Sequence, residues 1–167
     1  HIFLAAAGGG ALHLPGQILS DGLIDLVKAL NQAGGRLAWD AQGLISGREG
    51  EGLRFGEKVI YVGEDPLHFY LLSALALASP GKVKFTGGSN LKLADLSVWR
   101  NTLPAFGARQ AHLVPKSNGL PVHVECSALF DEEIALPEFT PLDGLIALLF
   151  AAPFWGAPVS LNGAANP

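Results

Sequence analysis

Short apolar runs alternate with glycine, proline and polar stops along the whole chain, and their spacing changes between that of helices and that of strands. Apolar side chains at helical spacing follow Ser20 and Asp21, one of which is expected to cap the helix, whereas alternating runs that end in glycine predict strands. The pattern predicts helices from residue 2 or earlier to about 8, and at 20–33, 66–78, 90–103 and 143–152. It predicts strands at 11–14, 58–62, 82–85 and 158–161, and hairpins over 36–47 and 110–126.

Two parts of the chain resemble each other at an offset of a little over 70 residues. Residues 11–16 are similar to 82–87, and residues 30–36 are similar to 103–109. A third copy begins with the helix predicted at 143–152. This period suits a compact unit of two helices and about four strands. We therefore predict one α/β (α+β) domain of repeated βαβαββ units, with a partial first repeat at 1–47, a second at 57–126 and a partial third at 132–163.

Composition limits the class of protein and its partners. An apolar fraction of 49% with 16% charged residues excludes intrinsic disorder. The net charge of −4 argues against nucleic acid as a partner. No apolar run reaches the ~18–20 residues of a membrane span, and the longest candidate, 142–155, contains Pro153, so no membrane partner is expected.

The chain has a single cysteine, Cys126, which excludes a disulfide framework within the chain. Free thiols suit a reducing compartment, so a cytoplasmic location is expected. Cys126 is interpreted as a small core residue, and a reactive thiol is the alternative.

Six segments, in order along nearly the whole chain, carry the motifs of one family. For example, Ser20 and Asp21 fall on its "LxSDD", and residues 120–124 fall on its "LPLxVxG". The segments are 4–22, 29–47, 62–81, 86–109, 120–124 and 148–153. By their order and spacing, the chain resembles the N-terminal half of EPSP synthase, in the enolpyruvyl transferase family.

This resemblance implies a fold and a chemistry. The family's inside-out α/β barrel has two lobes of three βαβαββ units each, with helices inside and sheets outside. Helix N-termini converge on the cleft between the lobes, where their free N–H groups attract anions. The reaction transfers the enolpyruvyl group from phosphoenolpyruvate to shikimate 3-phosphate, in the shikimate pathway of aromatic amino acid biosynthesis. It requires no metal or organic cofactor. The implied partners are an anionic substrate and a second lobe or a second copy of the chain.

The chain departs from the family at the positions that bind substrate. The family's "GDKSISHR" motif would lie just before His1, and its "GNSGT" turn corresponds to residues 63–67, Gly-Glu-Asp-Pro-Leu. The arginine expected after this turn is Tyr70, and the arginine of the "RP" motif falls at Ala94. No catalytic residue is therefore assigned.

The remaining candidates are positions at helix starts that would face the cleft. A carboxylate about 4 Å from a bound anion costs about 4 kcal/mol at an effective dielectric constant near 20. The acidic candidates would therefore disfavour a phosphate. They are interpreted either as ordinary helix caps or as parts of a pocket for a neutral or cationic ligand. The candidate substrate-binding residues are Gly63, Glu64, Asp65, His68, Lys92, Thr140 and Asp143.

Three candidates have competing interpretations. Lys92, near the start of the helix predicted at 90–103, is either a ligand contact or a solvated lysine. His68 is either a general acid or base, or a capping or surface histidine. His123 and Glu125 lie two residues apart on one predicted strand, but no third metal ligand is indicated and no metal is expected.

The sequence leaves two functional hypotheses and does not decide whether the protein is an enzyme. In the first, the chain is one lobe of an EPSP-synthase-like transferase. This lobe would be inactive alone, because the family's acid and base groups come partly from the other lobe. In the second, the chain is a diverged, non-catalytic domain of the same fold that serves binding or assembly.

Overall fold

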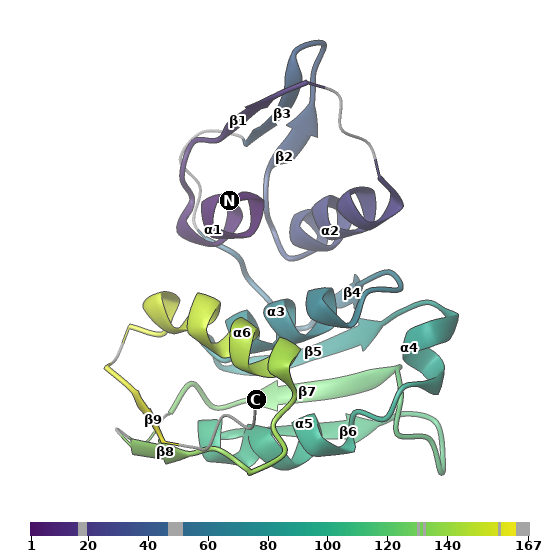
Figure 1. Cartoon of the computed structure of the whole chain (residues 1–167), viewed down its shortest axis with the longest axis vertical. Helices are drawn as coiled ribbons and strands as arrows, with labels where there is room; N and C mark the ends of the chain where they lie inside the picture. Colours follow the sequence, from purple (N-terminus) through teal and green to yellow (C-terminus); the bar gives the residue numbers. More distant parts are fainter. Residues whose placement is uncertain (17–19, 47–51, 130, 132, 157, 163–167) are drawn as a thin grey trace.

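The first part of the chain forms a small antiparallel sheet with two helices (Figure 1). Helix α1 (Ile2–Gly8) leads to strand β1 (His13–Pro15), and α2 (Asp21–Gln32) leads to the hairpin of β2 (Leu37–Trp39) and β3 (Gly43–Ser46). The sheet order is β1-β3-β2. The computed structural model describes residues 1–16, 20–46, 52–129, 131, 133–156 and 158–162.

The largest described sheet has four strands in the order β4-β5-β7-β6. Strands β4 (Val59–Tyr61) and β5 (Gly81–Thr86) are parallel, and α3 (Pro66–Ala76) connects them. Strands β6 (Ala108–His112) and β7 (Val122–Cys126) form an antiparallel hairpin, and β7 also pairs antiparallel with β5. The helices predicted at 20–33 and 66–78 and both predicted hairpins are thus confirmed over their described residues.

The last described part of the chain adds one helix and one strand pair. Strands β8 (Glu133–Ala135) and β9 (Ser160–Asn162) are parallel. Helix α6 (Leu142–Ala151) and the 3-10 turn η2 (Ala152–Phe154) connect them. The expectation of a strand at 158–161 is confirmed with a start two residues later. Strand β8 was not predicted.

Helix α3 lies at the centre of the apolar core. It is apolar on all sides, and every residue from His68 to Ala76 is buried. Helix α6 packs along it, as Figure 1 shows, and the rings of Phe69, Phe85 and Trp99 fill the space around it. A helix without a polar face is stable only where other elements surround it. The sequence of α3 therefore dictates its interior position.

The single helix predicted at 90–103 is wrong. The structure has α4 (Ser89–Leu93), then α5 (Ser97–Thr102) and the 3-10 turn η1 (Leu103–Phe106). Ala94 is extended at φ −66° and ψ 151°, which ends α4. Just before α5 begins, the carboxylate of Asp95 accepts a hydrogen bond from the Ser97 backbone N–H at 2.9 Å.

Several predicted boundaries lie at residues outside the described ranges. These are the end of the first hairpin and of the predicted first repeat, residue 47, and the limits of the third repeat, residues 132 and 163. Each described sheet lies within one stretch of chain, but the division into repeats stays a prediction. Within the described ranges, no helix combines the length and apolar character needed to cross a membrane.

Candidate functional site

The turn before α3 is built around Gly63 and Asp65. Gly63 adopts the left-handed conformation, at φ 76°, and a Cβ atom there would lie 2.8 Å from the Cβ of Asp25 on α2. Only glycine fits such a conformation and such a close approach without strain. Asp65 is the N-cap of α3, and its side chain accepts a hydrogen bond from the Leu67 N–H at 2.9 Å. The interpretation of Asp65 as an ordinary helix cap is thus confirmed.

Glu64 reaches across to the start of α4. Its two carboxylate oxygens accept hydrogen bonds from the backbone N–H groups of Ser89 and Asn90, each at 2.8 Å. A side chain on Gly88 would collide with this carboxylate, so the glycine makes room for it. The first N–H groups of a helix have no partner within the helix and attract anions. Here an anion of the chain itself takes them.

His68 is buried, with 7% of its surface exposed, so the interpretation as a surface histidine is wrong. Its Nδ1 lies 3.2 Å from the Val62 carbonyl oxygen. Because a carbonyl oxygen only accepts, Nδ1 carries the proton and donates it. The Nε2 atom lies 3.9 Å from the Asp65 carboxylate. The ring therefore ties the first turn of α3 to the end of β4.

Asp143 lies in the first turn of α6 and acts on Tyr70 in α3. Burial raises the pKa of the Tyr70 hydroxyl, and the negative charges of Asp143 and then Asp95 raise it further. The ring of Tyr70 packs edge-on against Trp99, with centroids 5.1 Å apart. In place of the arginine that the resemblance would put here, the structure thus has a buried, protonated phenol near two carboxylates.

Thr140 and Lys92 lie outside this group of residues. Thr140 donates its hydroxyl to the Pro137 carbonyl oxygen at 2.7 Å, which closes the turn before α6. Lys92 is exposed in the last turn of α4, not near the start of a long helix as expected. Within the described ranges its ammonium group forms no hydrogen bond or ion pair, as a solvated lysine would.

The structure thus brings Gly63, Glu64, Asp65 and His68 together between the starts of α3 and α4. Sequence reasoning missed Asp25, which packs on Gly63. It also missed that Glu64 bonds to Ser89 and Asn90, which lie 25 and 26 residues further along. No local spacing signals these contacts, because the fold alone makes the segments neighbours.

The described residues contain no group of three or more histidine, cysteine or acidic side chains placed to hold a metal ion. Glu125, considered beside His123, is paired instead with Arg109 on the neighbouring strand at 2.9 Å. A hydrogen bond from Arg109 and its positive charge lower the pKa of the Glu125 carboxyl.

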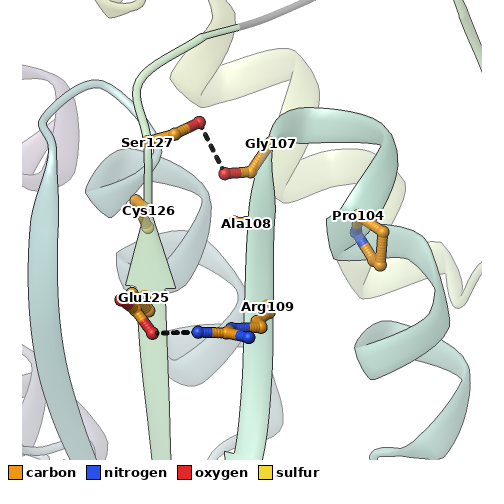
Figure 2. A pocket seen from close by; sticks show the side chains of 7 residues that line it. All are labelled: Pro104, Gly107, Ala108, Arg109, Glu125, Cys126 and Ser127. Atoms are coloured by element: carbon orange, nitrogen blue, oxygen red, sulfur yellow. Dashed lines mark hydrogen bonds and ion pairs between the residues drawn. The ribbon is translucent and has the colours of Figure 1, made fainter.

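A pocket of about 500 Å³ opens beside this ion pair, where β6 begins and β7 ends (Figure 2). Its polar side chains already have partners, since Arg109 binds Glu125 and the Ser127 hydroxyl donates to the Gly107 carbonyl oxygen at 2.7 Å. Burial raises the pKa of the Cys126 thiol to about 12. The thiol is therefore protonated at neutral pH, as expected of a core residue and not of a reactive cysteine.

Comparison with known proteins gives matches in structure only. No protein-family model matches the sequence, and neither does any curated protein. Two structures of EPSP synthase from Acinetobacter baumannii match with TM-scores of 0.75 and 0.78 at 18% and 19% identity. The chain has the fold of EPSP synthase. Each match covers 99% of this chain and 38% of the EPSP synthase chain, so the chain spans well under half of that length.

The comparison confirms the expected fold class, the α/β architecture of the inside-out barrel. At 18–19% identity the likeness shows the fold alone.

Proposed function

We propose that this chain is one lobe of an EPSP-synthase-like transferase, which takes part in enolpyruvyl transfer once a second lobe completes the site. The reaction would move the enolpyruvyl group from phosphoenolpyruvate to shikimate 3-phosphate and release phosphate. A role in aromatic amino acid biosynthesis in the cytoplasm belongs to the same proposal.

The observation that supports this proposal best is the direction of the two packed helices. The Trp155 ring, just after α6, donates its N–H to the Ala74 carbonyl oxygen near the end of α3 at 3.0 Å. Gly144, in the first turn of α6, lies against Trp99, whose ring packs on Tyr70 in the second turn of α3. Both helices therefore begin at the same end of the molecule. Helix starts that share one end bring the positive ends of two helix dipoles together, which favours an anionic ligand.

The second candidate is a non-catalytic domain of the same fold that serves binding or assembly. The bonds of Glu64 to the start of α4 favour it, because a substrate phosphate would have to displace a covalently tethered carboxylate. Asp65 and Asp143 add negative charge at the starts of α3 and α6. In this candidate the partner is another protein lobe or a second copy of the chain.

Release of inorganic phosphate distinguishes the two candidates. The measurement uses the protein as the cell makes it, including any sequence beyond these 167 residues. The transferase proposal expects phosphate release only when phosphoenolpyruvate and shikimate 3-phosphate are both present. A cooperatively folded protein that releases none in that mixture would contradict the transferase and support the non-catalytic domain.

A further inference from the structure

Basic side chains gather on the outer face of the four-stranded sheet. Successive residues of a strand point to opposite faces, so Lys82 and Lys84 of β5 lie on the same face. Val83 and Phe85 between and beside them are buried. In the antiparallel register Lys84 stands opposite His123 of β7, and Lys82 stands opposite Glu125. Two lysines and a histidine therefore occupy neighbouring positions on one surface.

These three residues line a pocket of about 170 Å³, together with Glu57, Lys58 and Val59. A cavity needs only about 10–15 Å³ of such volume to hold one water, so this pocket admits a small polyatomic ion. The ammonium of Lys58 is directed elsewhere, because its Nζ lies 3.4 Å from the position of a Cβ on Gly34. Lys82, Lys84 and His123 thus supply the positive groups of the pocket.

The positive charge of this pocket is incompletely balanced. Glu57 is the one carboxylate in its lining, and Glu125 beside Lys82 is already paired with Arg109. Within the described part of the chain, neither Lys82 nor Lys84 forms a side-chain hydrogen bond or ion pair.

The pKa of His123 also reflects the positive charge of Lys82 and Lys84. Partial burial lowers the pKa of His123, the charges of Lys82 and then Lys84 lower it further, and Glu57 opposes them. The positive charges of both lysines therefore act on the His123 ring. An anion placed between them would remove this repulsion and favour the protonated imidazole.

We propose that the pocket formed by Lys82, Lys84 and His123 binds a small oxyanion of the phosphate class, either inorganic phosphate or the phosphate group of a small phosphomonoester. The two ammonium groups and the protonated imidazole donate charge-assisted hydrogen bonds to its oxygens. This pocket lies on the outer face of the sheet and shares no residue with the helix starts of α3, α4 and α6. Its test is therefore independent of the transferase proposal.

The test follows backbone amides and the His123 ring by NMR during titration with inorganic phosphate at constant ionic strength. Sodium chloride at equal ionic strength corrects for screening. We expect saturable shifts at Lys84 and His123 and a rise in the pKa of His123 on binding. A parallel titration with glycerol 1-phosphate separates the two sources, since tighter binding of the monoester indicates an organic phosphate and tighter binding of phosphate indicates the free ion.

Variants assign the binding to the pocket. The double variant Lys82→Ala/Lys84→Ala is expected to weaken phosphate binding at least about tenfold, because it removes both charged donors. Lys28→Ala, which removes one exposed positive charge on α2, is the matched control and should bind like the unchanged chain. If the double variant unfolds, Lys84→Gln removes the charge of Lys84 but keeps most of the side-chain length, and it should still weaken binding. Shifts that do not saturate, that chloride reproduces, or that persist in these pocket variants would overturn the proposal.

Discussion

Single side chains explain why the candidate site differs from a simple anion pocket. The side chains of Glu64, Asp65 and His68 each form a hydrogen bond with a backbone group of the same molecule. Glu64 joins the most distant segments, since its two oxygens accept hydrogen bonds from N–H groups of α4, 25 and 26 residues away in sequence. The carboxylate stabilises the start of α4 in the way that a capping residue does.

Replacing Glu64 by alanine is expected to lower the free energy of unfolding by about 1 kcal/mol, because two helix N–H groups lose their partner. Urea unfolding measures this change as a lower midpoint at an unchanged slope. Glu138→Ala is the matched control, since Glu138 is exposed and has no side-chain partner among the described residues. It should shift the free energy by less than about 0.5 kcal/mol. Equal effects of the two variants would show that Glu64 does not cap α4.

Helix packing depends on one glycine where α6 crosses the core. A Cβ on Gly144 would lie 2.9 Å from Cζ3 of the buried Trp99 ring. That ring is also held by Tyr70, which packs edge-on against it, and by its own N–H, which donates to the Ser73 hydroxyl at 3.0 Å. It cannot move aside without breaking these contacts, so α6 would have to move instead.

Gly144→Ala is therefore expected to destabilise the protein. Overpacking costs about 1–3 kcal/mol, which exceeds the gain of up to about 1 kcal/mol from better helix propensity. Gly22→Ala is the control, because a Cβ at this position of α2 has open space around it. It should stabilise the protein by about 0.4–1 kcal/mol. Thermal unfolding of both variants tests the pair, and a stabilised Gly144→Ala variant would contradict the close packing.

Elements that depend on interactions between neighbouring residues were predictable from the sequence, and elements that depend on distant contacts were not. The turn of the first hairpin follows from Asp40, whose carboxylate accepts hydrogen bonds from the N–H groups of Gln42 and Gly43 at 2.8 and 2.9 Å. The break between α4 and α5 depends partly on a distant contact, the Leu96 N–H donating to the Asn118 carbonyl oxygen at 3.0 Å. Helical periodicity continues through such a break, so the sequence alone predicted one helix.

Taken as a whole molecule, the fold was more predictable than the site. The apolar pattern is spread over many positions, so errors at single ends did not change the α/β architecture. The site depends on a few contacts between distant segments, such as Asp25 with Gly63 and Glu64 with Ser89 and Asn90. Residue types at helix starts indicated where to look, but they did not show that Glu64 is already bound to α4.

Calorimetric titration of the chain with shikimate 3-phosphate, with and without phosphoenolpyruvate, tests the account of the helix starts most directly. We predict no binding to residues 1–167 alone at millimolar ligand, because Glu64 takes the N–H groups of α4, Asp65 caps α3, and the proposed anion site is completed only by a second lobe. Micromolar binding would contradict this account, because the helix starts of this lobe would then bind the anion without a second lobe.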